Sequence, residues 1–336
     1  MASAECKKVD VHAITAIEGE EVARLAGSLK DSNMLQPVKF KSGGINCAAD
    51  LYLPPEFSQS RKFPGLVVGH GTGQTKKSLV DQGEFFSHAG YVVLTIDYRS
   101  FGESDGDPRG QLFPLVQVED LRNGVSFLQS LPGVDPDRIG IWGTSNSGGI
   151  VIYAAAVDQR IKAVVAQVPV VDHYRWMRWL RSQREWWELR ARVEEDRQRR
   201  YETGEGARIP VSTLDTFCYR PMLQNMLAKT RTAMEKTGRP PLAPGASDVL
   251  LESVEKALEF SATSVIHRIA PRALSIITTK DDDAHPIEQI LEAYEMAREP
   301  KRLTLLDRYV LDVYWEPGLS IALGKAVEWY DQYLRP

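Results

Sequence analysis

The stretch from Ile141 to Gly149, IWGTSNSGG, has the residue types and spacing of a turn that presents a nucleophilic serine. An apolar run at 138–142 leads into it, and a helix-like segment at 147–157 follows it. Small residues flank Ser145, as such a turn requires, because larger side chains would clash where strand and helix meet. The pattern therefore predicts a serine hydroxyl at the carboxyl edge of a sheet, beside backbone N–H groups that can bind an oxyanion.

The usual pattern of this turn is G-x-S-x-G, whereas this chain reads G-x-S-x-S-G with Ser147 at the fifth position. Serine is small enough for that position. Ser145 is the better candidate nucleophile because Gly143 stands two residues before it, whereas Ser147 has no glycine at the corresponding place.

Short apolar runs rich in β-branched residues alternate with helix-like segments along most of the chain. Buried strands that alternate with amphipathic helices are typical of an α/β fold, with a mostly parallel central sheet flanked by helices. A short helix is also expected within 18–32. The expected strands are 65–70, 91–97, 138–142, 161–168, 272–278 and 302–306, and the expected helices are 76–89, 114–131, 147–157, 286–298 and 319–334.

The alternation stops over 172–261, which is charged, rich in tryptophan and mostly helical in pattern. We predict that this segment is an inserted helical lid. The core then comprises 38–171 and 262–336, preceded by an N-terminal extension, 1–37. Basic residues within the lid are interleaved with acidic ones, which favours a solvated helix face over an anion-binding patch.

Other motifs point to the same edge of the sheet. His70 and Gly71 end an early strand, so the backbone N–H of Thr72 is a candidate oxyanion donor together with that of Asn146. The stretch 97–106, DYRSFGESDG, leads from a strand into the next helix.

These motifs resemble those of the α/β-hydrolase superfamily, and within it the dienelactone-hydrolase-like and polyketide-pathway hydrolases with a helical lid. The resemblance covers about 38–171 and 262–336. It rests on GHGTG, DYRSFGESDG, LPGVDPDRIGIWGTSNSGG and VAQVP. It implies a triad in the chain order nucleophile, acid, histidine. We place four further residues at the substrate-binding site: His70, Tyr98, Trp176 and Trp179.

The acid is expected just after a late strand, four residues before a proline, which gives Asp282. Asp281 and Asp283 are its rivals. An acidic turn that caps the following helix is the structural alternative.

The expected histidine is missing. In relatives the corresponding loop reads like Gly-Gly-His-Phe-Asp-Val-Tyr, and here Val310 stands where the histidine belongs. Two other histidines are candidate bases. His173 follows a strand where the chain enters the lid, and we prefer it to His285, which shares the loop of Asp282. Without a base, serine is a poor nucleophile, and loss of one triad member costs up to about 10⁶-fold in rate.

Three functions remain open. The first is a non-hydrolytic enzyme (a cyclase, lyase or isomerase) that acts on a hydrophobic carbonyl compound in natural-product metabolism, with the Ser145 hydroxyl as a hydrogen-bond donor. The second is a serine hydrolase of esters, lactones or carbon–carbon bonds with a relocated base. The third is a catalytically silent binding protein. We favour the first because Val310 cannot accept a proton.

Composition excludes several classes of function. The 336 residues carry a formal charge of -4, which gives no reason to expect nucleic acid or an anionic membrane. The three cysteines are too few for a disulfide framework or a zinc site. We expect a cytoplasmic protein without metal or cofactor. Its expected partners are a small-molecule substrate and, as one option, a second copy of the chain.

Overall fold

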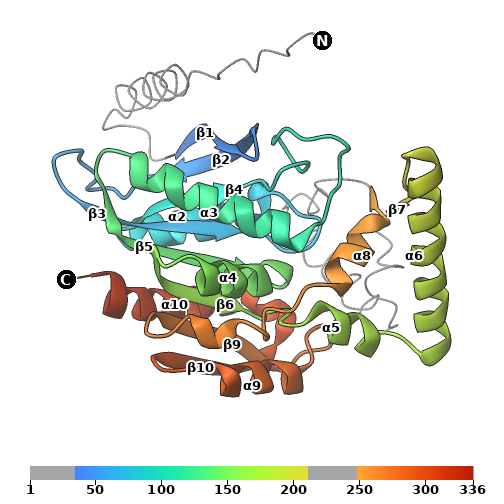
Figure 1. The fold of residues 1–336 in the computed structure, drawn as a ribbon. Coiled ribbons are helices and arrows are strands. Elements are labelled where there is room, and N and C mark those ends of the chain that lie inside the picture. The colour runs from blue at the N-terminus through green and yellow to red at the C-terminus, as the bar shows by residue number, and fades with distance from the viewer. Residues whose placement is uncertain (1–34, 211–247, 336) are drawn as a thin grey trace, which may run out of the picture.

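A computed structural model describes residues 35–210 and 248–335 of the chain. Its main sheet has eight strands in the order β1-β2-β4-β3-β5-β6-β9-β10 (Figure 1). Neighbours from β4 to β10 are parallel, whereas β1 and β2 join the edge as an antiparallel hairpin. The strands are β1 Leu35–Ser42, β2 Ile45–Tyr52, β3 Phe63–Gly69, β4 Val92–Ile96, β5 Val134–Thr144, β6 Ile161–Gln167, β9 Ala273–Asp281 and β10 Lys301–Tyr309.

The burial of each strand explains its place in the sheet. Every residue of β3 and β4 is buried, as expected for central parallel strands covered on both faces. In β1 buried and exposed residues alternate toward the end of the strand, which is typical of an edge strand with one solvated face. The mostly parallel α/β sheet predicted from the apolar runs is therefore confirmed.

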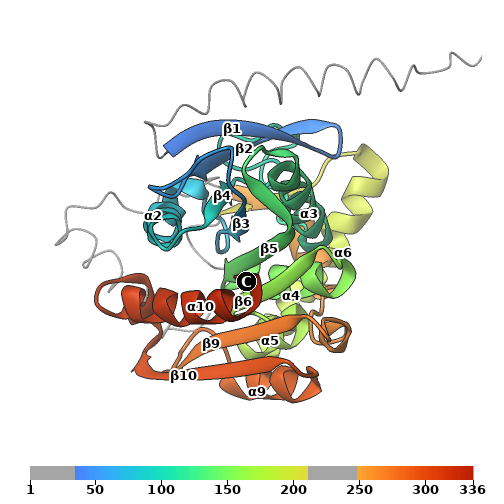
Figure 2. The ribbon, with the colours of Figure 1, turned by 90° about the vertical axis from the view of Figure 1, so that its left-hand side faces the viewer.

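Helices cover both faces of the sheet (Figure 2). On one face α2 and α10 pack in an apolar cluster that includes Phe86 of α2 and Trp142 of β5. On the other face α3, α4 and α9 pack in a second apolar cluster. The helices of the core are η1 Lys76–Leu79, α2 Val80–His88, α3 Pro114–Ser130, α4 Asn146–Val157, η2 Ile266–Arg268, α9 Ile287–Met296, η3 Val310–Tyr314 and α10 Gly318–Leu334.

We call the segment between β6 and η2 the insertion, and its described elements lie at one side of the sheet (Figure 1). Helix α6 begins with a capping box formed by Ser182 and Glu185, and it ends at Gly204 in the left-handed conformation. The described elements of the insertion are α5 His173–Trp179, α6 Gln183–Thr203, β7 Arg208–Pro210, β8 Asp248–Leu250 and α8 Glu252–Leu258.

Two details differ from the expectation. β1 begins at Leu35, three residues before the expected core boundary. The insertion also contains an antiparallel pair of strands, β7 and β8, where the sequence suggested helices. The short helix expected within 18–32 lies outside the described residues.

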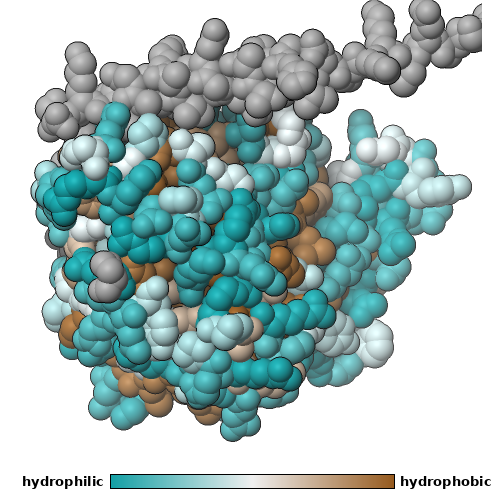
Figure 3. Space-filling model, turned by 60° about the vertical axis from the view of Figure 1, so that its left-hand side comes forward, coloured by the Kyte–Doolittle hydropathy of each residue, from teal (hydrophilic) through white to brown (hydrophobic). Residues whose placement is uncertain are grey.

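The face in Figure 3 is mainly hydrophilic, with hydrophobic residues in small, separate patches. Within 35–210 and 248–335, no helix is long and apolar enough to cross a membrane.

Candidate active site

Ser145 lies at the bend between β5 and α4, where its φ of 54° and ψ of −118° are unusual for a residue other than glycine. Hydrogen bonds hold both its backbone N–H and its backbone carbonyl. The N–H donates to Gln167 O at 3.0 Å, and the carbonyl accepts from Gly148 N at 2.9 Å and Val170 N at 3.0 Å. Such a held, strained conformation is typical of a serine presented for chemistry.

The close approach of strand and helix explains the small residues around Ser145. A Cβ on Gly143 would collide with the carbonyl group of Ser147, and one on Gly149 would collide with Val170 O. The bend can form only with glycine at these positions.

Ser147 uses the fifth position of the motif for hydrogen bonding. Its hydroxyl donates to His70 O and also lies 2.7 Å from the Tyr98 hydroxyl. Ser147 therefore links α4 to the end of β3, which leads into the loop with Thr72.

His285 joins Ser145 to Asp282. Its Nε2 lies 3.0 Å from Ser145 Oγ, and its Nδ1 lies 3.0 Å from Asp282 Oδ2. Both the His285 and Asp282 side chains are buried. An Asp282 carboxylate that accepts a hydrogen bond from Nδ1–H leaves Nε2 free to accept the Ser145 proton. The three side chains therefore have the geometry of a nucleophile, base and acid.

The loop itself shapes this arrangement. Asp282 Oδ1 accepts hydrogen bonds from the backbone N–H groups of Ala284 and His285, each at 2.8 Å. This turn brings the His285 ring back over the carboxylate. Asp281 is exposed and Asp283 is partly buried, and the structure gives His285 no hydrogen bond to either of them.

His173, preferred as the base from the sequence, has a different partner. Its Nε2 lies 2.6 Å from Asn146 Oδ1, whereas the imidazole on Ser145 Oγ is that of His285. Burial lowers the pKa of His173 from 6.5 to about 3, so the ring stays neutral near pH 7. The assignment of His173 as the base is therefore corrected in favour of His285.

The two candidate oxyanion donors flank the serine. Asn146 is the first residue of α4, and Thr72 lies in the turn that follows β3. A Cβ placed on Gly71 would be 3.7 Å from Ser145 Cβ, so this turn runs directly beside the serine. Backbone N–H groups of both elements can therefore approach an oxygen bound at Ser145.

The expected substrate-binding residues contact other groups of the protein. His70 and Tyr98 are buried with their rings 4.8 Å apart, and His70 Nδ1 is 2.9 Å from Gly71 O. Burial lowers the pKa of His70, which favours a neutral ring. The Trp176 indole donates to Ala284 O at 2.8 Å, and Trp179 is a half-buried residue packed against the apolar core. His70 and Tyr98 are therefore buried residues that support the turn after β3, and they offer no exposed surface to a substrate.

Val310 begins η3, directly after β10, and is buried in the apolar cluster under α10. Four residues later, Tyr314 is bonded to Thr144 through its hydroxyl at 2.8 Å. Valine has no group that can accept a proton, so Val310 cannot serve Ser145 as a base. The sequence feature that could have pointed to His285 is its spacing from Asp282, because the two residues are three positions apart in one loop.

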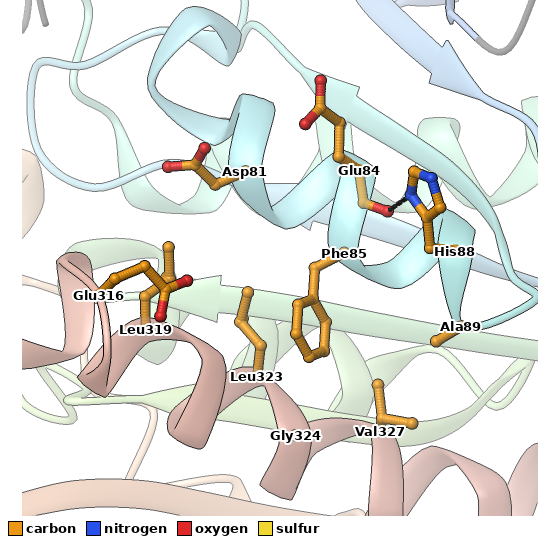
Figure 4. Close-up of a pocket in the computed structure, with 10 residues that line it drawn as sticks. All are labelled: Asp81, Glu84, Phe85, His88, Ala89, Glu316, Leu319, Leu323, Gly324 and Val327. Carbon is orange, nitrogen blue, oxygen red and sulfur yellow. Dashed lines mark hydrogen bonds between the residues drawn. The ribbon is translucent and has the colours of Figure 1, made fainter.

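A separate groove of about 570 Å³ lies between α2 and α10 (Figure 4). Leucine, valine and phenylalanine side chains form its floor, and Asp81, Glu84 and Glu316 stand at its rim. None of the residues that line it is a candidate site residue.

Residues 43–305 match the family described as X-Pro dipeptidyl-peptidase (S15 family). The chain belongs to this family. This S15-family chain shares its fold with solved structures, as the α/β-hydrolase resemblance implies. One is the α/β hydrolase GrgF from Penicillium, with a TM-score of 0.74 and 24% identity over 89% of this chain and 99% of that chain.

Curated relatives match shorter parts of the S15-family chain. The quorum-quenching protein AidA of Acinetobacter baumannii is 40% identical over 41% of this chain and 44% of its own length. The thiohydrolase aneE of Aspergillus aculeatus is 39% identical over 32% and 35%. The polyketide transferase grgF of Penicillium is 26% identical over 74% and 81%. The chain thus spans less than half the length of the first two relatives.

Proposed function

We propose that the chain is a serine-dependent acyl-transfer enzyme that cleaves esters or thioesters. The observation that carries this proposal is the imidazole of His285, 3.0 Å from Ser145 Oγ and bonded to Asp282. A serine with an oriented base beside it is an activated nucleophile.

The chemistry follows from the positions of these groups. Ser145 Oγ attacks the acyl carbon while its proton moves to His285 Nε2, and the carbonyl oxygen becomes an oxyanion that the N–H groups of Thr72 and Asn146 stabilise. The C–O or C–S bond then breaks, and His285 returns the proton to the leaving alcohol or thiol. Water or another nucleophile, deprotonated by His285, releases the acyl group from Ser145.

The non-hydrolytic hypothesis depended on a missing base. Val310 indeed supplies none, but His285 reaches the serine from the loop of the acid. The geometry therefore supports the alternative hypothesis of a relocated base, with His285 in place of His173.

For the substrate we propose a hydrophobic acyl thioester or ester of natural-product metabolism. Two observations support this class. Relatives include a thiohydrolase and a polyketide transferase. Next to the loop of His285, the insertion packs the buried aromatic ring of Trp176. We also retain the proposals that the protein is cytoplasmic and that its partner is a small molecule.

A fluorophosphonate probe tests the proposed nucleophile and base. Intact-protein mass should show one adduct per chain, no adduct for Ser145→Ala, and labelling slowed at least about 10³-fold for His285→Ala. His88→Ala is the matched control because His88 is exposed on α2, and it should label like the unaltered protein. Labelling that survives Ser145→Ala, or that ignores His285→Ala, would rule out this mechanism.

A further inference from the structure

The side chain of Asn146 joins three helices next to the nucleophile. Its Oδ1 lies 2.6 Å from His173 Nε2 of α5, and its Nδ2 donates to Gln117 Oε1 of α3 at 3.2 Å. All three residues are buried. The residue that follows Ser145 is therefore held from both sides by hydrogen bonds that no proton-transfer step uses.

The direction of these bonds is fixed by the partners. Asn146 Nδ2 donates to Gln117, so the amide oxygen is the group that faces His173. A neutral ring must then carry its hydrogen on Nε2 and donate it to Asn146 Oδ1. The other ring nitrogen, Nδ1, is buried without a partner among the described residues, so it carries the lone pair.

His173 is also fixed in place by its surroundings. Its ring meets Phe260 edge-on at 5.1 Å and Trp176 at 6.1 Å between centroids. Its backbone N–H donates to Phe260 O at 3.2 Å. A ring held this firmly can hold the side chain to which it donates.

We infer that His173 is a positioning residue of the oxyanion hole, which orients the backbone N–H of Asn146 by holding the Asn146 side chain. This inference rests on the proposed function and deepens it. The N–H belongs to the peptide unit between Ser145 and Asn146, so a shift of the Asn146 side chain turns the donor away from the acyl oxygen. Misplacement of a catalytic group by about 1 Å can cost 10²-fold in rate.

Substitutions at 173 separate this role from simple packing. His173→Phe keeps a ring but cannot donate, and we expect kcat for a p-nitrophenyl acyl ester to fall about 10- to 100-fold with little change in KM. His173→Gln retains an N–H donor and should restore most of that loss. His88→Phe, on the exposed face of α2, is the control and should leave kcat unchanged.

A double-mutant cycle tests whether His173 acts through Asn146. Asn146→Ala keeps the backbone N–H and removes only the side chain. It should lower kcat about as much as His173→Phe, and the double variant should be no worse than either single one. Additive losses, or an unchanged kcat in His173→Phe, would overturn the inference.

A second readout does not need turnover. The ¹⁵N resonance of the Asn146 backbone amide should shift in His173→Phe and stay near its original position in His173→Gln. If the unaltered protein is not labelled by fluorophosphonate, the proposed function fails, while this resonance still decides whether His173 holds Asn146. An unmoved resonance in His173→Phe would overturn the inference by itself.

Discussion

His285 lies within hydrogen-bond distance of both Asp282 and Ser145 because it follows Asp282 by three residues in one tight loop. The Asp282 carboxylate accepts both the backbone N–H and the ring N–H of His285, so one side chain shapes the loop and orients the imidazole. In the expected arrangement the histidine instead comes from the loop after the next strand, where this chain has Val310. In the proposed mechanism, the acid and the base therefore come from a single loop.

The first prediction concerns the acid. Asp282→Asn should lower kcat/KM about 10⁴-fold, because an amide favours the wrong tautomer of His285 and does not stabilise the imidazolium. Asp281→Asn is the matched control because Asp281 is exposed, and it should change kcat/KM less than about twofold. Steady-state kinetics with a p-nitrophenyl ester would measure both. Equal losses in the two variants would refute the assignment of Asp282.

The second prediction concerns Ser147. Ser147→Ala removes the partner of the fully buried Tyr98 hydroxyl, so the free energy of unfolding should fall by about 1–3 kcal/mol. Adding Tyr98→Phe removes the orphaned hydroxyl and should recover part of this loss. Urea denaturation of the single and double variants measures the difference. A double variant that is less stable than Ser147→Ala by the full cost of a second lost bond would contradict this account.

The sequence predicts Ser145 as the candidate nucleophile because its glycine spacing reflects a steric requirement. It predicts Asp282 as the candidate acid because its place relative to the strand and to Pro286 follows the family pattern. It led us to prefer His173 to His285, whereas the ring beside Ser145 Oγ is that of His285. Both follow strand ends on the same edge of a parallel sheet, and only the course of the two loops decides which ring reaches the serine. The hydrogen bond of His173 to Asn146 has no local signal in the sequence.

At the scale of elements, helix α5 touches both halves of the candidate site. Its first residue, His173, bonds to Asn146, and Trp176 one turn later donates to Ala284 O in the loop of the candidate base. A single short helix of the insertion therefore contacts both Asn146, the candidate oxyanion donor, and the loop of His285.

The third prediction tests this coupling on the side of the base. Trp176→Phe keeps an aromatic ring but leaves Ala284 O without its donor. The loop should then hold the His285 imidazole less accurately relative to Ser145, and kcat should fall about tenfold. Trp187→Phe is the matched control because Trp187 is 63% exposed on α6, and it should leave kcat unchanged. Kinetics and thermal unfolding of both variants should be compared. A loss of stability without a loss of kcat in Trp176→Phe would indicate packing alone.

Helices and strands with a strong periodicity of apolar residues were predictable from the sequence, whereas β7 and β8 were not. Each of these strands has three residues, and β7 ends in a proline, so neither shows the alternation that marks a strand. They pair although 37 residues of the sequence lie between Pro210 and Asp248. Such a pairing depends on tertiary contacts, which local sequence patterns do not contain.

At the scale of the whole molecule, the sheet was predictable because a strand buried on both faces must be apolar along its full length. β3 and β4 are buried at every residue and, apart from Thr95, carry no polar side chain, so their runs stand out in the sequence. The insertion was recognisable only because the alternation of apolar strands and amphipathic helices stops there. Its consequence for the molecule is that a neutral, buried histidine, His173, lies where the insertion meets the core.

The last prediction follows from that histidine. Its pKa is about 3 in the folded protein and near 6.5 when the chain is unfolded, so between these values the unfolded chain binds the proton more readily. The stability that the neutral His173 contributes is therefore complete above pH 6.5 and is lost as the pH falls toward 3. The glutamine in His173→Gln does not titrate. The contributions of all other titrating groups therefore cancel when the pH dependence of stability is compared between the two proteins. Relative to this variant, the unaltered protein should lose about 1 kcal/mol of unfolding free energy between pH 7.5 and 5.5. Urea denaturation at both pH values measures the difference, and a difference that does not change with pH would show that folding does not lower the pKa of His173.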